Sequence, residues 1–259
     1  MDKPKNLAEI WIPEDKKIFF FSDAHLGNQP YHLEKSREEK LISFIQKISK
    51  ETEYVFILGD LFDFWFEYNK SIYKRYIRIL SELMAFTDNN INVNYLVGNH
   101  DFWMKDLFKK FFHFNLHFNP VILNYGKDKV FIAHGDGLNP KDRGYLFVKR
   151  IFRSDLTVKL FSSLHPDLAW AIAHNFSKTS RKYTEQYSSS EIEELKKFSK
   201  NKIENEHFNK VILGHTHNPE ITSFKNGEYI NSGDWINHFS YIEACGNKWE
   251  LKYYSKTEK

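Results

Sequence analysis

The stretch IFFFSDAHLG, residues 18–27, decides how this chain folds. Its apolar run stops abruptly at Asp23 and His25, two residue types that bind metal ions and that lie two positions apart. An unpaired carboxylate is costly to remove from water, so a buried strand that ends in Asp-x-His favours a cation close to its end. The stretch therefore predicts a buried strand that delivers polar ligands at its carboxyl end.

The same pattern recurs four times along the chain. The further runs are YVFILGD (54–60), VNYLVGNHD (93–101), KVFIAHGD (129–136) and KVILGHTH (210–217), and their polar ends are Asp60, Asn99, His100, His134, His215 and His217. In open α/β sheets, sites assemble at the carboxyl ends of the strands. We therefore expect these side chains to meet at one edge of the fold.

The composition fits one globular domain with a substantial core. Of the 259 residues, 41% are hydrophobic and 17% aromatic, which argues against disorder. The formal charge of +3 suits an anionic substrate or a membrane surface without requiring a nucleic acid. The single cysteine, Cys245, cannot form an intrachain disulfide, which favours a reducing compartment.

Neither a secretory signal nor a membrane span is visible in the sequence. Residues 1–17 lack the apolar centre of a signal peptide, and no apolar run reaches the length of a transmembrane helix. We therefore expect a cytoplasmic protein that associates with a membrane only peripherally.

Helices are expected where apolar residues recur at helical spacing, and strands where short apolar runs end at turn residues. The expected helices cover residues 33–48, 71–88, about 103–110, 145–152, 156–164, 166–176 and 190–207. The expected hairpins pair 121–124 with 129–133, 221–224 with 228–230, and 241–244 with 249–253. Helix 33–48 lies between two apolar runs, which predicts a β-α-β crossover with parallel strands.

These elements predict an α/β (α+β) fold in one domain, residues 1–259. Residues 141–207 carry no strand signal and interrupt a second half that is otherwise mostly β. We therefore expect a helical cap, inserted at about 141–207, that lies over the site and is not a separate domain.

The ligand types at the five strand ends point to hard or borderline divalent metals. The set contains carboxylate, amide and imidazole groups but no thiolate, so Mn, Fe, Zn, Co and Mg are candidates. It is larger than one tetrahedral zinc ion requires. The seven candidate ligands are Asp23, His25, Asp60, Asn99, His134, His215 and His217. Two metals about 3.5–4 Å apart that share one carboxylate would suit hydrolysis of a phosphoester.

The motifs SDAHLG, GDLFD, GNHD, HGD and GHTH together resemble the calcineurin-like metallophosphoesterase superfamily, from residue 22 to residue 217. The resemblance implies a two-sheet β sandwich flanked by helices, with a dinuclear centre, most often manganese, at the strand ends. It also implies how the ligands divide. One metal is held by Asp23, His25 and His217, and the other by Asn99, His134 and His215, with Asp60 as the bridge.

His100 and Asp63 are the predicted catalytic pair. His100 directly follows Asn99, and Asp63 lies three residues after Asp60, where its carboxylate could hydrogen-bond the imidazole. An imidazole held in this way can bind phosphate or protonate a leaving oxygen, which contributes about 10²–10⁴-fold to a rate. The alternative is a histidine that only caps a turn.

Longer matches resemble one family within the superfamily. The segments GDLFDFWFE, HGDGLNPKDRGY, LFSSLHPDLAW and NSGDWI are similar to those of UDP-2,3-diacylglucosamine hydrolases. The resemblance implies cleavage of a pyrophosphate to UMP and 2,3-diacylglucosamine 1-phosphate in lipid A biosynthesis. It implies substrate contacts from Asn99 and Asp142, and Arg143 could clamp a phosphate oxygen. Well-studied members carry Arg where this chain has His100.

The helical stretch could bind the lipid part of such a substrate. Its apolar residues include Leu156, Leu160, Phe161, Leu164, Leu168, Trp170, Ile172 and Phe176. Its basic residues, which could meet phosphates or an anionic leaflet, include Lys149, Arg150, Arg153, Arg181 and Lys182. The alternative is that the apolar face is internal packing and the charges are solvated.

The expected partners are a nucleotide-sugar lipid and the inner surface of the inner membrane, with no nucleic acid; the oligomeric state is left open. The main alternative activity is a phosphodiesterase or pyrophosphatase acting on another nucleotide derivative. An inactive scaffold with the same fold is disfavoured, because every ligand position is filled.

Overall fold

The computed structural model describes residues 7–139 and 143–255, with the backbone alone for residues 143 and 173–188. Within that part of the chain, the strands form two six-stranded sheets. The first sheet has the order β12-β11-β2-β3-β4-β5. Its strands are β2 (Ile18–Phe21), β3 (Tyr54–Ile57), β4 (Asn92–Leu96), β5 (Asn115–His117), β11 (Ser240–Cys245) and β12 (Lys248–Tyr253).

The second sheet has the order β1-β6-β7-β8-β10-β9. Its strands are β1 (Ala8–Ile12), β6 (Val121–Tyr125), β7 (Asp128–Ile132), β8 (Lys210–Leu213), β9 (Glu220–Phe224) and β10 (Gly227–Asn231). All three predicted hairpins pair as antiparallel strands, and β2, β3 and β4 are parallel as the crossover pattern predicted.

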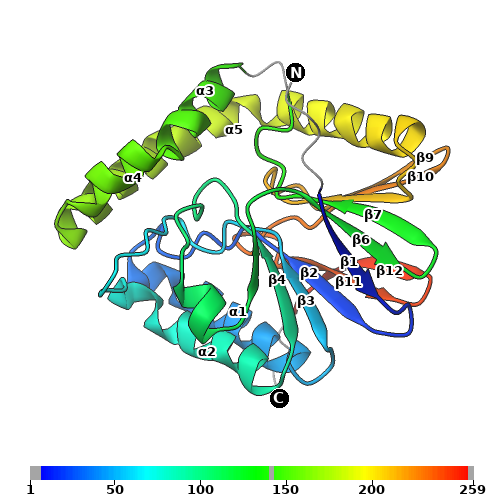
Figure 1. The fold of residues 1–259 in the computed structure, drawn as a ribbon, viewed down its shortest axis with the longest axis horizontal. Helices are drawn as coiled ribbons and strands as arrows, with labels where there is room; N and C mark the ends of the chain where they lie inside the picture. Colours follow the sequence, from blue (N-terminus) through cyan, green and yellow to red (C-terminus); the bar gives the residue numbers. More distant parts are fainter. Residues whose placement is uncertain (1–6, 140–142, 256–259) are drawn as a thin grey trace.

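Helices cover the outer faces of both sheets, which confirms the predicted two-sheet architecture flanked by helices (Figure 1). Helices α1 (Tyr31–Ile48) and α2 (Ile77–Asp88) pack on the first sheet, and α5 (Pro166–Asn205) packs on the second. Helices α3 (Arg143–Phe152) and α4 (Asp155–Ser162) extend beyond the sheets. We call α3, α4 and α5 the helical insertion, because they lie between β7 and β8.

Strand β2 explains why the opening stretch is apolar without interruption. Its side chains alternate between two cores: Phe19 and Phe21 pack with α1, whereas Ile18 and Phe20 pack between the sheets. All four side chains are buried. A strand that is covered on both faces cannot alternate with polar residues, so the apolar run continues until Ser22.

Four of the expected helices need correction. The two expected helices at 166–176 and 190–207 are one 40-residue helix, α5. The polar sequence between them lacks the apolar repeat on which the prediction relied. The expected helix at 71–88 is a 3₁₀ turn, Lys74–Tyr76, followed by α2, and the one near 103–110 is a π-helix, Leu107–Phe111.

Two strands, β1 and β5, were not expected. Both are edge strands, and β5 has three residues. Strand β1 leaves Trp11 largely exposed, so its pattern does not resemble that of a buried strand. Among the described residues, no helix combines the length and apolarity that crossing a membrane requires.

Candidate metal centre

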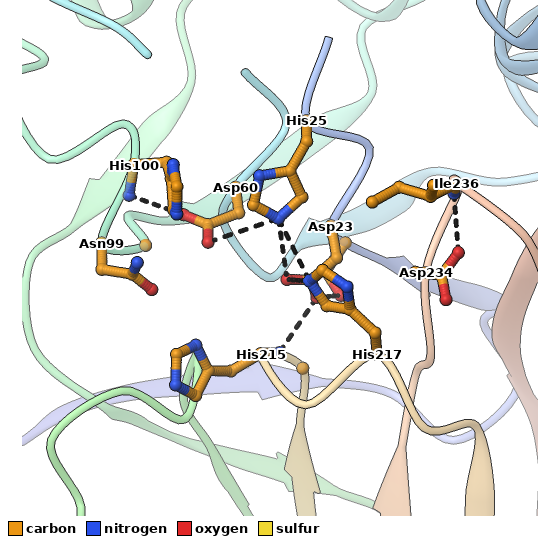
Figure 2. Close-up of polar contacts among 12 residues, drawn as sticks. Asp23, His25, Asp60, Asn99, His100, His215, His217, Asp234 and Ile236 are labelled. Atoms are coloured by element: carbon orange, nitrogen blue, oxygen red, sulfur yellow. Dashed lines mark hydrogen bonds and ion pairs between the residues drawn. The ribbon is translucent and has the colours of Figure 1, made fainter. Parts of the chain in front are cut away.

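All seven predicted ligands lie at the carboxyl ends of inner strands, where the two sheets meet. Figure 2 labels all of them except His134. Asp23 and His25 follow β2, Asp60 follows β3 and Asn99 follows β4. His134 follows β7, and the two remaining histidines, His215 and His217, follow β8. Their ligand atoms form two groups, each within 4.8 Å: Asp23, His25 and His217, and Asp60, His134 and His215.

Asp60 belongs to the second group but also lies next to the first. Its Oδ2 atom is 3.7 Å from His25 Nε2 in one group and 3.3 Å from His134 Nε2 in the other. Its Oδ1 atom accepts a hydrogen bond of 2.8 Å from the His100 backbone N–H. Asn99 Oδ1 lies 3.1 Å from His134 Nε2. One carboxylate therefore faces both sets of imidazoles.

The backbone at the centre is strained. Five ligands have left-handed φ angles, namely Asp23 (56°), His25 (43°), Asp60 (52°), His215 (70°) and His217 (54°). Such a conformation costs on the order of 1–3 kcal/mol per residue and persists only where the surroundings enforce it. Hydrogen bonds between the loops supply that enforcement: Asp23 N–H donates to Gly59 O and His25 N–H donates to Asp60 O.

Two glycines of the motifs are required by close approach. A Cβ atom on Gly98 would lie 2.1 Å from Asp60 Oδ1, and one on Gly214 would lie 2.7 Å from Asp23 Oδ2. Both distances are far below van der Waals contact. The glycines of GNHD and GHTH therefore let the two carboxylates lie against neighbouring backbone.

The environment of Asp23 fits a bound cation. The side chain is fully buried, and its Oδ2 atom accepts hydrogen bonds from Ser22 Oγ and from the His215 N–H at 3.0 Å. Its Oδ1 atom is buried without a hydrogen-bond partner among the described residues. His217 Nε2 and His25 Nε2 lie 3.3 and 3.7 Å from that oxygen. A buried carboxylate oxygen with two imidazole nitrogens beside it is a donor set that suits a divalent metal ion.

The raised pKa values of two histidines also favour a cation at this place. Burial acts to lower the pKa of His25, but the nearby carboxylates of Asp23 and Asp63 outweigh it and raise the pKa to about 10. Burial is likewise outweighed at His134, where the charge of Asp60 raises the pKa to about 10. The buried carboxylates thus attract positive charge, and divalent metals satisfy that demand in place of protons.

The structure places His100 differently from the expected dyad. His100 Nδ1 donates to the backbone carbonyl of Asp63 at 2.8 Å, whereas the Asp63 carboxylate is 4.0 Å away. That carboxylate is closer to His25 Nδ1, at 3.6 Å. The expected carboxylate–imidazole hydrogen bond is therefore replaced by a carbonyl–imidazole bond. A carbonyl only accepts, so the proton lies on Nδ1 and Nε2 remains for a substrate.

Glu191 contacts a candidate metal ligand, and this contact was not predicted from the sequence. This residue of α5 places Oε1 2.9 Å from Nε2 of His215, a candidate metal ligand 24 positions later in the chain. Carboxylates that hold ligand histidines in this way fix the orientation of the ring. The only sequence signal is an acidic residue near the predicted helix start, which is common on solvated helices.

An apolar cavity of about 350 Å³ adjoins the metal centre. Its lining includes the candidate ligand Asn99 together with Asp63 and His100. The rest of its lining comes from aromatic loops and from the helical insertion: Phe64, Phe102, Trp103, Tyr145, Val148, Lys149, Phe152, Arg153, Phe161 and Ile172. Asp142 lies outside the described residues, and the side chains of Arg143, Phe176, Arg181 and Lys182 are not described.

Residues 16–219 match the family model of the calcineurin-like phosphoesterases. The chain belongs to the calcineurin-like phosphoesterase family, and it is a metal-dependent hydrolase with the predicted fold class. Among curated proteins, it is similar to enzymes named UDP-2,3-diacylglucosamine hydrolase. The one from Porphyromonas gingivalis is 27% identical over 242 residues, which cover 87% of this chain and 92% of that protein.

The enzyme of the same name from Histophilus somni is 30% identical over 243 residues, which cover 91% of this chain and 99% of that protein. Among solved structures, the phosphoesterase Yfce from E. coli aligns with a TM-score of 0.44 and 15% identity, over 88% of this chain and 87% of that one. The predicted family is confirmed by the family model and the curated relatives.

Proposed function

We propose that this protein cleaves the pyrophosphate of UDP-2,3-diacylglucosamine to UMP and 2,3-diacylglucosamine 1-phosphate, a step of lipid A biosynthesis. The observation that carries the proposal is the apolar cavity whose lining includes Asn99 and His100. A phosphate at the metal centre would continue directly into an apolar lining that suits acyl chains. The cavity volume falls within the range of small-molecule sites, roughly 300–1,000 Å³. The names of the curated relatives support the same substrate.

The proposed cofactor is a pair of divalent metal ions, with Mn²⁺ the first choice among Mn, Fe, Zn, Co and Mg. Asp23, His25 and His217 would hold one ion, and Asn99, His134 and His215 the other, with Asp60 between them. Such ions lower the pKa of bound water and polarise a phosphoryl oxygen.

The proposed reaction is a hydrolysis of the pyrophosphate. Water attacks the α-phosphorus, the bond from that phosphorus to the bridging oxygen breaks, and this oxygen leaves with the sugar phosphate. His100 is held through Nδ1 by the Asp63 carbonyl, which leaves its Nε2 atom for the substrate. When the ring carries its second proton, Nε2–H donates to a phosphoryl oxygen or passes that proton to the leaving oxygen. Asp63 acts through its carbonyl on His100 and through its carboxylate on His25.

The helical insertion is proposed as a cap within a single domain, with Asp142 and Arg143 among the substrate contacts. Its surface carries exposed Phe147, Leu156 and Leu160 beside Lys159, a combination that suits a membrane with anionic lipid. Flotation with vesicles tests this surface: binding is expected with phosphatidylglycerol vesicles and not with phosphatidylcholine alone. Absence of binding to both would remove the peripheral membrane role.

Parallel assays test the substrate. The Mn²⁺-loaded protein is given UDP-2,3-diacylglucosamine, unacylated UDP-glucosamine and ADP-ribose at equal concentrations, and UMP or AMP release is measured. We expect the acylated substrate to be cleaved with by far the highest kcat/KM, because only its acyl chains occupy the cavity. Equal rates on the unacylated compounds would favour a general nucleotide pyrophosphatase.

A further inference from the structure

Two basic side chains, one from helix α3 and one from the turn directly after it, lie at the cavity beside the metal centre. Lys149 and Arg153 are four residues apart, and both line the cavity together with Asn99 and His100. Neighbouring Arg150 is exposed and does not line it. Two cations at this place are unexpected for a cavity with so apolar a lining.

The lysine is already neutralised by Asp136, which follows His134 in the HGD motif. Lys149 Nζ lies 2.5 Å from Asp136 Oδ2 and also donates to the Asp136 carbonyl at 3.1 Å. The Tyr145 hydroxyl donates to the same carboxylate at 2.8 Å. Asp136 therefore holds α3 beside the metal centre through its contacts with Lys149 and Tyr145.

The arginine retains its charge and part of its donor capacity. Arg153 Nη2 donates to the Gly98 carbonyl at 3.3 Å and lies 4.0 Å from Asp136 Oδ2. Its Nε atom is buried without a hydrogen-bond partner among the described residues. Because Lys149 takes the single charge of Asp136, one positive charge remains on Arg153, next to the strand end that carries Asn99.

We propose that Arg153 binds the phosphate that leaves with the diacylated sugar, an inference that rests on the proposed function. A pyrophosphate has two phosphate groups, and the metal centre accounts for the one that is attacked. The second phosphate leads toward the acyl chains, hence into the cavity that Arg153 lines. It gains a negative charge as the bridging bond breaks, and a guanidinium fixed in place stabilises that charge.

The test compares a substrate that has a second phosphate with one that lacks it. Wild type, Arg153→Ala, Arg153→Lys and the matched control Arg150→Ala are assayed on UDP-2,3-diacylglucosamine and on bis-p-nitrophenyl phosphate. We expect Arg153→Ala to lower the ratio of the two kcat/KM values by about 10–100-fold. Arg153→Lys keeps the positive charge but loses the planar guanidinium group, so its ratio should lie between those of wild type and Arg153→Ala. Arg150→Ala should keep the wild-type ratio.

A binding measurement separates phosphate recognition from a structural effect. Calorimetry compares 2,3-diacylglucosamine 1-phosphate with 2,3-diacylglucosamine, and Arg153→Ala is expected to lose the preference for the phosphorylated lipid. An unchanged preference, or an equal loss of activity on both substrates, would overturn the role of Arg153. A wild-type protein that hydrolyses the diester but no pyrophosphate would instead overturn the proposed function, and this inference with it.

Discussion

At the scale of single residues, the two halves of the candidate metal centre depend on Asp60. Its carboxylate faces histidines of both groups, and its backbone adopts a left-handed conformation. Asn and Asp tolerate that conformation better than other residues with a Cβ atom. Substitution by Asn therefore removes the charge with little change in backbone energy.

The first prediction concerns Asp60→Asn. We expect the variant to fold but to lose at least one of two bound metal ions, and its phosphodiesterase activity to fall to background. Elemental analysis of the purified protein and hydrolysis of bis-p-nitrophenyl phosphate with Mn²⁺ measure the two effects. A variant that keeps two metals and the wild-type rate would refute a bridging role for this carboxylate.

The second prediction concerns His100→Ala. Only the backbone N–H of His100 contacts Asp60, and its imidazole is held by the Asp63 carbonyl. We therefore expect metal content to stay at the wild-type value while kcat falls by about 10²–10⁴-fold. His32, exposed on α1, provides the control substitution. Loss of a metal ion from His100→Ala would reassign this histidine as a ligand.

At the scale of elements, α5 connects the helical insertion to the metal centre. Its C-terminal part is anchored on the second sheet, where Leu195 and Ile203 are buried with Phe131, Val211 and Tyr229. One turn before Leu195, Glu191 reaches His215. The packing of this helix therefore places a carboxylate against a metal ligand.

The third prediction is that Glu191→Gln weakens metal binding. An amide holds the imidazole less firmly and removes a charge, so we expect the affinity for Mn²⁺ to fall by about 10–100-fold. Calorimetric titration of metal-free protein measures it directly. Glu193→Gln is the matched control, because Glu193 is exposed and pairs with Lys196 on the same helix. Equal affinities of the two variants would show that the Glu191 contact is incidental.

The elements differ in how well the sequence predicted them, and burial explains the difference. Strands β2, β3, β4, β7 and β8 are buried, so their apolar runs and polar ends are unambiguous. Edge strand β1 is covered on fewer sides and was missed. The middle of α5 was missed because its sequence has no apolar repeat, although the backbone remains helical. Apolar periodicity is the signal from which a helix is predicted, so a helical segment whose sequence lacks it is missed.

At the scale of the whole molecule, the metal centre joins the two sheets. Asp23, Asp60 and Asn99 come from the first sheet, whereas His134, His215 and His217 come from the second. Ions bound between them would therefore cross-link two layers that otherwise meet through apolar packing. Binding to the native state alone raises its stability by mass action.

The fourth prediction follows from this arrangement. Removal of metal with EDTA should lower the thermal midpoint of unfolding, and Mn²⁺ at about 100 times its Kd should restore roughly 2.7 kcal/mol of stability for each ion bound. For a chain of this size that corresponds to about 5–10 °C. Differential scanning calorimetry with Mn²⁺, Zn²⁺, Co²⁺ and Mg²⁺ also ranks the ions. Identical midpoints with and without every ion would argue against a centre that links the sheets.

The sequence by itself determined the strands of the centre, the identity of the seven candidate ligands and the class of chemistry. It could do so because buried strands and metal ligands both leave local patterns. Only the tertiary structure decided that Asp63 holds His100 through its carbonyl, that Glu191 contacts His215, and that Arg153 lies at the cavity. These contacts join residues that are 24 to 55 positions apart. Their geometry depends on how whole elements pack, and no local pattern encodes it.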